Sequence, residues 1–133
     1  MKISRKIKIP IIVAAIIAFL LMLYYAIFFY PTNDLFSEAK SILAGEKVVD
    51  ESNPLWRYNF RKKNYPDTET IDSSIARIWV WHNGKEGVMQ VLYSVRYYDK
   101  NGKIDYCSIG IPSKWYIEKE NGEWKVTKID EHP

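Results

Sequence analysis

Few side chains in this sequence could act as a general base or a nucleophile. His82 and His132 are the two imidazoles, and Cys107 is the only thiol. Catalysis by such a group needs a second group that orients or activates it, and the sequence contains no HExxH, GxSxG or glycine-rich phosphate-binding motif. We therefore expect no catalytic residue, no cofactor and no metal ligand. His82 is expected at the solvated rim of a strand, and Cys107 in the core as a small apolar residue.

The run Trp79-Val80-Trp81-His82 brings two indoles and an imidazole together. Alternate residues of a strand share a face, so Trp79 and Trp81 point to one side of a sheet and Val80 points to the other. Two interpretations are open. Either the face with the indoles is core or is covered by a helix, or both indoles are exposed and form a binding surface together with His82.

A basic cluster occupies the segment LWRYNFRKK. Its members are Arg57, Arg61, Lys62 and Lys63. Three aromatic residues alternate with polar ones in the same segment, namely Trp56, Tyr58 and Phe60. Alternation of this kind predicts a half-buried strand. The cluster is then either a solvated strand face or a surface that contacts anionic lipid head groups or a partner protein.

The N-terminal part of the chain is suited to lipid. Ile11–Tyr30 contains no charge, no Gly and no Pro, and a helix of this length spans roughly the 30 Å of a bilayer's hydrocarbon core. Four basic residues precede it, Lys2, Arg5, Lys6 and Lys8, and no acidic residue occurs before Asp34. The positive-inside rule then places residues 1–8 in the cytoplasm, residues 9–30 in the cell membrane as a single transmembrane helix, and residues 31–133 outside the cytoplasm.

The apolar segment is expected to be retained as an anchor. It is longer than the apolar region of a secretory signal, and it ends in bulky aromatic residues where a cleavage site needs small ones. The alternative is a cleaved signal and a secreted domain. Residues 31–133 carry 15 Lys and Arg against 16 Asp and Glu, a net charge of −1. This balance argues against a nucleic acid as partner.

The remaining elements follow from periodicity and turn residues. An apolar stripe predicts a short amphipathic helix over about 34–44, begun by N-cap candidates at Thr32-Asn33-Asp34 after Pro31 has ended the membrane helix. Three Asn-Gly pairs, at 83–84, 101–102 and 121–122, predict hairpin turns between four strands. Gly110-Ile111-Pro112 predicts either a bulge in the third strand or a division into two short ones.

The strand faces can be assigned from the same alternation. Met89, Val91, Tyr93, Val95 and Tyr97 share one face of the second strand. Ala76, Ile78 and Val80 are expected to share a face of the first strand, and Trp115 and Ile117 match Trp124 and Val126 across the last turn. Apolar residues on both faces of the second strand favour a curved antiparallel sheet with a helix in its concave side.

The ending KWYIEKENGEWKVTKIDE resembles the closing hairpin of small exported domains with the nuclear-transport-factor-two-like, or cystatin-like, roll. The matching residues are Trp115, Lys119, Asn121, Gly122, Trp124, Lys125 and Val126. The resemblance covers about the last 60 residues and implies an α+β fold in which a curved β-meander wraps a helix. It departs from the pattern at the front, where one short helix is evident in place of two or three. Enzymes of this class use a polar residue inside the roll, a role that the resemblance would give to Glu118 or Arg96.

Two functions are consistent with these features. The first is a membrane-anchored, extracytoplasmic, non-catalytic binding or assembly module, and the resemblance implies an accessory subunit of an envelope or transfer complex. Its partners would be the lipid bilayer and another protein, with the oligomeric state open. The alternative is a roll with a concave pocket that binds a small ligand or acts on one.

Overall fold

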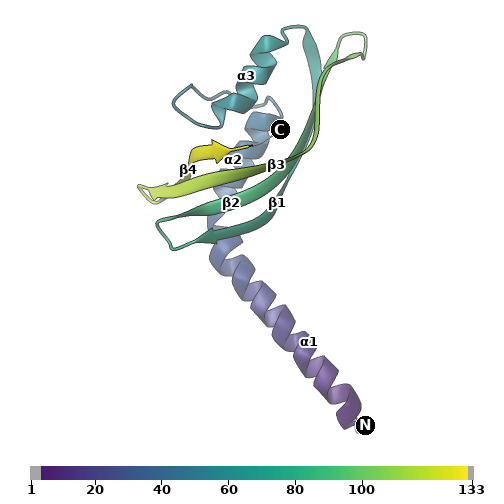
Figure 1. Cartoon of the computed structure of the whole chain (residues 1–133), viewed down its shortest axis with the longest axis vertical. Helices are drawn as coiled ribbons and strands as arrows, with labels where there is room; N and C mark the ends of the chain where they lie inside the picture. The colour runs from purple at the N-terminus through teal and green to yellow at the C-terminus, as the bar shows by residue number, and fades with distance from the viewer. Residues whose placement is uncertain (1–3, 132–133) are drawn as a thin grey trace.

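The computed structural model describes residues 4–131, apart from the side chain of Phe60; Lys2 and His132 lie outside the described residues. Helix α1 (Arg5–Tyr24) continues through a π turn (Tyr25–Phe29) and a 3-10 turn (Tyr30–Thr32) into α2 (Asn33–Leu43). Helix α3 (Trp56–Asn64) follows, and then strands β1 (Thr68–His82), β2 (Glu86–Asp99), β3 (Ile104–Glu120) and β4 (Glu123–Asp130). The chain has the α+β fold that the sequence predicts, with helices against one curved antiparallel sheet (Figure 1).

The sheet is a meander in the order β1-β2-β3-β4, and every neighbouring pair is antiparallel. Each of the three Asn-Gly pairs lies in one of its hairpin turns, as predicted. The last turn shows why these residues are needed, because Asn121 and Gly122 both adopt positive φ, 53° and 81°. A two-residue hairpin loop of this type requires that conformation at both positions.

The register of the sheet shifts at five places, and two of these shifts bear on the predictions. Gly110, with φ of 63°, lies where β3 changes register against β2, and its amide donates to the Ser94 hydroxyl at 2.9 Å. The bulge alternative for Gly110-Ile111-Pro112 is therefore confirmed. A second bulge lies between Arg77 and Trp79 in β1. It makes Ile78 an extra residue that is exposed, so the prediction that Ile78 shares a face with buried Val80 is wrong.

The concave face of the sheet packs on α2 and α3. The buried apolar residues that form this core are Leu35, Ala39, Ile42, Leu43, Leu55, Tyr58, Val80, Met89, Val91, Tyr93, Val95, Tyr97, Trp115, Ile117, Trp124 and Val126. The predicted inner face of β2 is confirmed, as is the matched pair of faces across the last hairpin. The predicted helix at 34–44 is confirmed as α2, whose stripe lies on the core.

Residues 56–64 form helix α3, so the prediction of a strand there is wrong. A turn at Asn53 and Pro54 leads into the helix: the Asn53 side-chain oxygen accepts the Leu55 amide at 3.0 Å, and the Asn53 carbonyl accepts the Trp56 amide at 2.8 Å. The buried side chains then recur at helical spacing, as Leu55, Tyr58 and Asn59. Asn59 accepts the Val49 amide at 2.8 Å, which ties the preceding loop to the helix.

The predicted break at Pro31 is also absent. Helical backbone continues from Arg5 to Leu43, and Thr32 makes no capping bond to α2. Pro31 falls in the 3-10 segment and has no N–H to give to the preceding turn, and nearby the Thr32 hydroxyl donates to the Phe29 carbonyl at 2.9 Å. Arg77 of β1 braces this junction, because its guanidinium donates to the Phe29 carbonyl at 3.0 Å and to the Asn33 side-chain oxygen at 2.6 Å.

Helix α1 projects away from the sheet and nothing in the domain covers it (Figure 1). None of its described residues is buried, and it is long and apolar enough to cross a membrane. Its last residue reaches β1, the strand at the near edge of the sheet. The Tyr24 hydroxyl accepts the Val80 amide at 3.0 Å and donates to the Val80 carbonyl at 2.8 Å.

Candidate functional site

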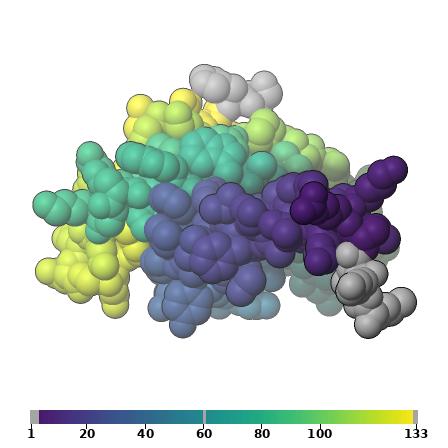
Figure 2. Space-filling view, turned by 90° about the horizontal axis from the view of Figure 1, so that it is seen from below, coloured from purple at the N-terminus to yellow at the C-terminus, as the bar shows by residue number. Residues whose placement is uncertain are grey.

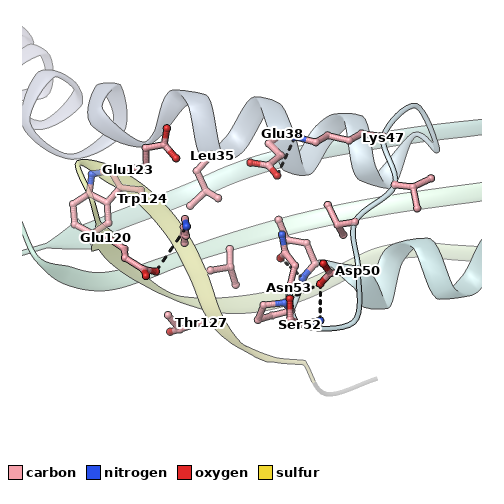
Figure 3. Close-up of a pocket in the computed structure, with 16 residues that line it drawn as sticks. Leu35, Glu38, Lys47, Asp50, Ser52, Asn53, Glu120, Glu123, Trp124 and Thr127 are labelled. Carbon is pink, nitrogen blue, oxygen red and sulfur yellow. Dashed lines mark hydrogen bonds and ion pairs between the residues drawn. The ribbon is translucent and has the colours of Figure 1, made fainter.

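A groove of about 840 Å³ lies beside β4 (Figure 3). Helix α2 forms one wall, the loop of residues 47–55 forms the second, and β4 with its hairpin forms the third. The lining residues are Leu35, Glu38, Lys47, Val48, Val49, Asp50, Ser52, Asn53, Pro54, Leu55, Glu120, Glu123, Trp124, Lys125, Val126 and Thr127. The groove thus runs along the outer edge of the last strand.

The groove carries an excess of negative charge. Four carboxylates line it, those of Glu38, Asp50, Glu120 and Glu123, against the ammonium groups of Lys47 and Lys125. Both lysines are already paired, one with Glu38 at 3.2 Å and the other with Glu120 at 3.8 Å. Hydrogen bonds from the Ser52 hydroxyl and amide lower the pKa of Asp50, so that carboxyl stays ionised at neutral pH.

The β4 edge offers hydrogen-bonding groups to this groove. β4 pairs with β3 alone, in a register that opposes Glu120 to Glu123 and Ile117 to Val126. Backbone groups of an antiparallel strand point alternately toward and away from its partner, so the N–H and C=O groups of Trp124 and Val126 face outward. Their side chains are buried in the core. An edge of this kind is a template for another strand.

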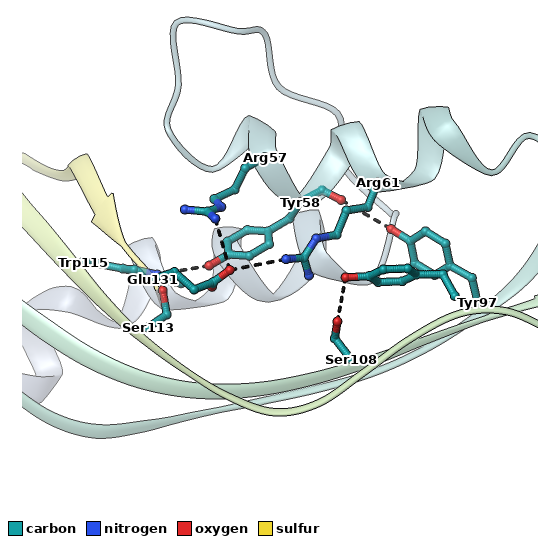
Figure 4. A network of polar contacts seen from close by, with 9 residues as sticks. Arg57, Tyr58, Arg61, Tyr97, Ser108, Ser113, Trp115 and Glu131 are labelled. Carbon is teal, nitrogen blue, oxygen red and sulfur yellow. Dashed lines mark hydrogen bonds and ion pairs between the residues drawn. The ribbon is translucent and has the colours of Figure 1, made fainter. Parts of the chain in front are cut away.

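A polar cluster lies beside the apolar core, between α3 and the sheet (Figure 4). One oxygen of Glu131 accepts from Arg57 at 3.1 Å and from Arg61 at 3.3 Å. The Arg61 guanidinium lies against the rings of Tyr58, Tyr93 and Tyr106 at 5.4–5.8 Å from their centroids. Burial raises the pKa of Tyr58 and of Tyr93, which keeps both phenols neutral.

Three polar atoms of this cluster have no hydrogen-bond partner within residues 4–131: one Arg61 nitrogen, the Tyr93 hydroxyl and the second Glu131 oxygen. Over the same residues, no group of three His, Cys, Asp or Glu side chains is arranged to hold a metal ion. Glu118 is exposed, and Arg96 is partly exposed and 4.0 Å from Asp72. Neither lies inside the roll, so the role that the resemblance would give them is not supported by their positions.

Trp79 and Trp81 are both exposed, at 40% and 51% of their surface. With Tyr24, Phe28, Val80 and Val88 they line an open apolar groove of about 500 Å³ between the end of α1 and the sheet. The sequence left two interpretations open, a covered face and an exposed pair of indoles. The structure agrees with the exposed pair. The indoles point away from the core because Val80, between them, is buried.

His82 is not at a solvated rim. Its ring packs on Trp124 at 4.6 Å and on Phe28 at 5.3 Å between centroids, so it joins the π turn after α1 to β4. Burial lowers its pKa, opposed by the carbonyl groups of Ile27 and Phe28. The prediction that Cys107 is buried is also wrong, because this residue lies on the outer face of β3 and is exposed.

The predicted basic cluster is divided by helix α3. Arg57 and Arg61 turn toward Glu131, whereas Lys62 and Lys63 remain exposed. Figure 1 places α3 at the end of the domain away from α1. The structure therefore separates this cluster from Trp79, Trp81 and His82, which lie beside α1. The groove along β4 was not identified from the sequence, in which Glu120, Glu123 and Lys125 have the character of ordinary hairpin residues.

No protein-family model matches the chain, and no curated protein matches it. One similar solved structure is a variant of a designed nuclear-transport-factor-two-like protein. It is 13% identical, covers 77% of this chain and 90% of its own, and has a TM-score of 0.40. The fold described above rests on the chain's own element order and sheet register.

Proposed function

We propose that this chain is a membrane-anchored, extracytoplasmic and non-catalytic domain that binds an extended segment of a partner protein along β4. The anchoring part is supported by α1. A helix with apolar residues on every side needs either lipid or a large protein core around it. Every described residue of α1 is exposed except Tyr24, which contacts β1.

The orientation is supported by charge. Arg5, Lys6 and Lys8 lie at the start of α1, and basic residues are retained on the cytoplasmic side. Protease added to intact protoplasts should therefore digest the domain of residues 31–133. A C-terminal tag that survives this treatment, but is lost once the protoplasts are lysed, would show the opposite orientation.

The binding part rests on one observation, the hollow beside an unpaired strand edge. A partner segment in extended conformation would take the outward amide and carbonyl groups of Trp124 and Val126 as hydrogen-bond partners. The carboxylates of Asp50 and Glu123 favour a segment with Lys or Arg, because opposite potentials select partners and orient them. Such a module would join a larger assembly at the membrane surface.

A photo-reactive amino acid at Thr127, on β4 within the groove, tests this proposal in native membranes. Cross-linking should yield a defined adduct with a second protein. Glu123→Lys should reduce its amount by roughly tenfold, since it replaces an attractive charge with a repulsive one. Glu69→Lys on β1, outside the groove, makes the same charge change and should leave the adduct intact. Recovery of monomer alone, or equal loss in both variants, would contradict groove binding.

A second candidate, a roll that binds a small anion, is favoured by the unpaired polar atoms around Arg61. An anionic ligand could replace Glu131 between the two guanidinium groups. The measurement is native mass spectrometry of the chain released from mild detergent, before and after the substitution Glu131→Ala. A bound small molecule, or a gain in acetate binding in the variant, supports this candidate, and an empty interior in both excludes it.

A further inference from the structure

The depth of the sheet relative to α1 is fixed by a pair of hydrogen bonds. Tyr24 belongs to the last turn of α1, and its hydroxyl is bonded to both the amide and the carbonyl of Val80. The end of β1 is thereby held at the level of this turn. Phe28 adds a second contact one turn later, through its ring against His82 at 5.3 Å.

This level lies near the outer boundary of a bilayer that α1 crosses. The helix rises ~1.5 Å per residue, so Tyr24 lies roughly 22 Å beyond Ile9, the first apolar residue after Lys8, and Phe28 lies roughly 28 Å beyond it. The hydrocarbon core of a bilayer is about 30 Å thick. Val80, at the level of Tyr24, is then within roughly 8 Å of the outer edge of the hydrocarbon, and His82, which packs on Phe28, is at that edge.

The side chains on either side of Val80 have the chemistry of that boundary. Trp79 and Trp81 are exposed, and the groove between them and α1 has no charged residue in its lining. Indoles combine a large apolar surface with one N–H donor, and they concentrate at membrane–water interfaces. Seen from below, the β1–β2 hairpin lies beside the helix at the end of the molecule from which α1 projects (Figure 2).

We infer that Trp79 and Trp81 insert into the head-group layer of the same bilayer that α1 crosses, so that the end of β1 lies on the membrane. The inference rests on the anchoring half of the proposed function, and it is independent of the groove along β4. Lipid is the occupant of the apolar groove because its lining is continuous with the lipid-facing surface of α1 through Tyr24 and Phe28.

Tryptophan fluorescence can test the placement directly. All five tryptophans lie beyond α1, so quenching by lipid reports on the domain and not on the anchor. The full chain is reconstituted, one copy per nanodisc, in phosphatidylcholine with or without bromine on the upper acyl carbons. The native chain should be quenched strongly by the brominated lipid, and the quenched fraction should fall roughly threefold or more in W79F/W81F, because Trp115 and Trp124 are buried in the core and Trp56 lies on α3.

The control is Trp56→Phe, which removes an indole from α3 at the far end of the domain and should leave the quenching unchanged. Near-UV circular dichroism confirms that each variant is folded. Flotation of the chain with unbrominated vesicles checks the anchor separately. A chain that floats but shows little quenching, or equal quenching in W79F/W81F, overturns this inference and leaves the anchor intact. A chain that does not float overturns the anchor as well.

Discussion

The carboxylate of Glu131 should contribute substantially to the stability of the domain, although it comes directly after the last strand. Its side chain is 5% exposed, and one oxygen accepts hydrogen bonds from both Arg57 and Arg61. Charge-assisted hydrogen bonds contribute about 1.5–3 kcal/mol each and neutral ones about 0.5–1.5 kcal/mol. Glu131→Gln keeps the charged donors but removes the carboxylate that neutralises both guanidinium groups. Because Arg57 is partly solvated, the expected loss is about 2 kcal/mol, less than the about 3–5 kcal/mol of a fully buried ion pair.

A loss of this size lowers the melting temperature of a domain of this length by roughly 8–15 °C. The assay is unfolding of the full chain in mild detergent, by heat and by urea, followed by tryptophan fluorescence. Trp115 reports on the cluster, because its indole nitrogen donates to the Tyr58 hydroxyl at 3.2 Å. Urea unfolding gives the free energy of unfolding from the shift of the midpoint at constant slope.

Glu120→Gln is the matched control. It makes the same chemical change at the last residue of β3, which pairs with the first residue of β4. Its carboxylate is 67% exposed and lies 3.8 Å from Lys125, and exposed pairs contribute about 0–1 kcal/mol. If the free energies of unfolding of the two variants agree within about 0.5 kcal/mol, the contacts of Glu131 do not stabilise the roll, and the reasoning from burial is refuted.

Three further predictions concern single side chains. Tyr24→Phe removes both bonds to Val80, so amide exchange at the end of β1 should accelerate by roughly tenfold, for a local cost of about 1–2 kcal/mol; unchanged exchange would show that the hydroxyl does not hold the strand. Gly87→Ala places a methyl group against the backbone of β1 and should lower the free energy of unfolding by about 1–3 kcal/mol. The added methyl of Gly84→Ala meets no atom within 4 Å, so this variant should lose about 1 kcal/mol through its positive φ alone. Equal urea midpoints for the two variants would contradict the close approach at Gly87. Burial raises the pKa of Tyr97 to about 12. The neutral phenol therefore stabilises the fold fully below its unfolded pKa of about 10, and this stabilisation is lost as pH rises from there through the folded value. Tyr97→Phe should reduce the alkaline fall in the free energy of unfolding measured by urea, and an equal fall in the variant and the native chain would contradict this.

Much of the sheet could be predicted because its signals are local. Asn-Gly pairs specify their own turns, and strict alternation in β2 matches the side chains that the core buries. The helix at 56–64 could not be predicted from the same rule, because Trp56 and Tyr58 alternate with polar residues while the buried set is Leu55, Tyr58 and Asn59. Nothing in the local sequence marks Asn59 as a buried residue. It is buried because it makes three hydrogen bonds to chain segments 10–17 residues away.

The candidate surfaces depend on contacts that no local pattern contains. Whether Trp79 and Trp81 are exposed depends on the bulge at Ile78, which shifts the inward positions from Arg77 to Val80. The groove along β4 exists because the loop of residues 47–55 stands off from the strand, and nothing in the alternation of β4 indicates that distance. Arg61 was predicted as surface charge, and its inward position requires Glu131, 70 residues later.

The uninterrupted helical backbone from Arg5 to Leu43 has a mechanical consequence. A membrane helix longer than the local hydrocarbon thickness tilts to match it. Here α2, which lies in the core, continues the same helical path, and Arg77 stiffens the connection between them. On the proposed topology, a thinner bilayer would tilt the whole sheet together with α1. The thickness of the lipid around the anchor would then set the angle between the β4 groove and the membrane surface.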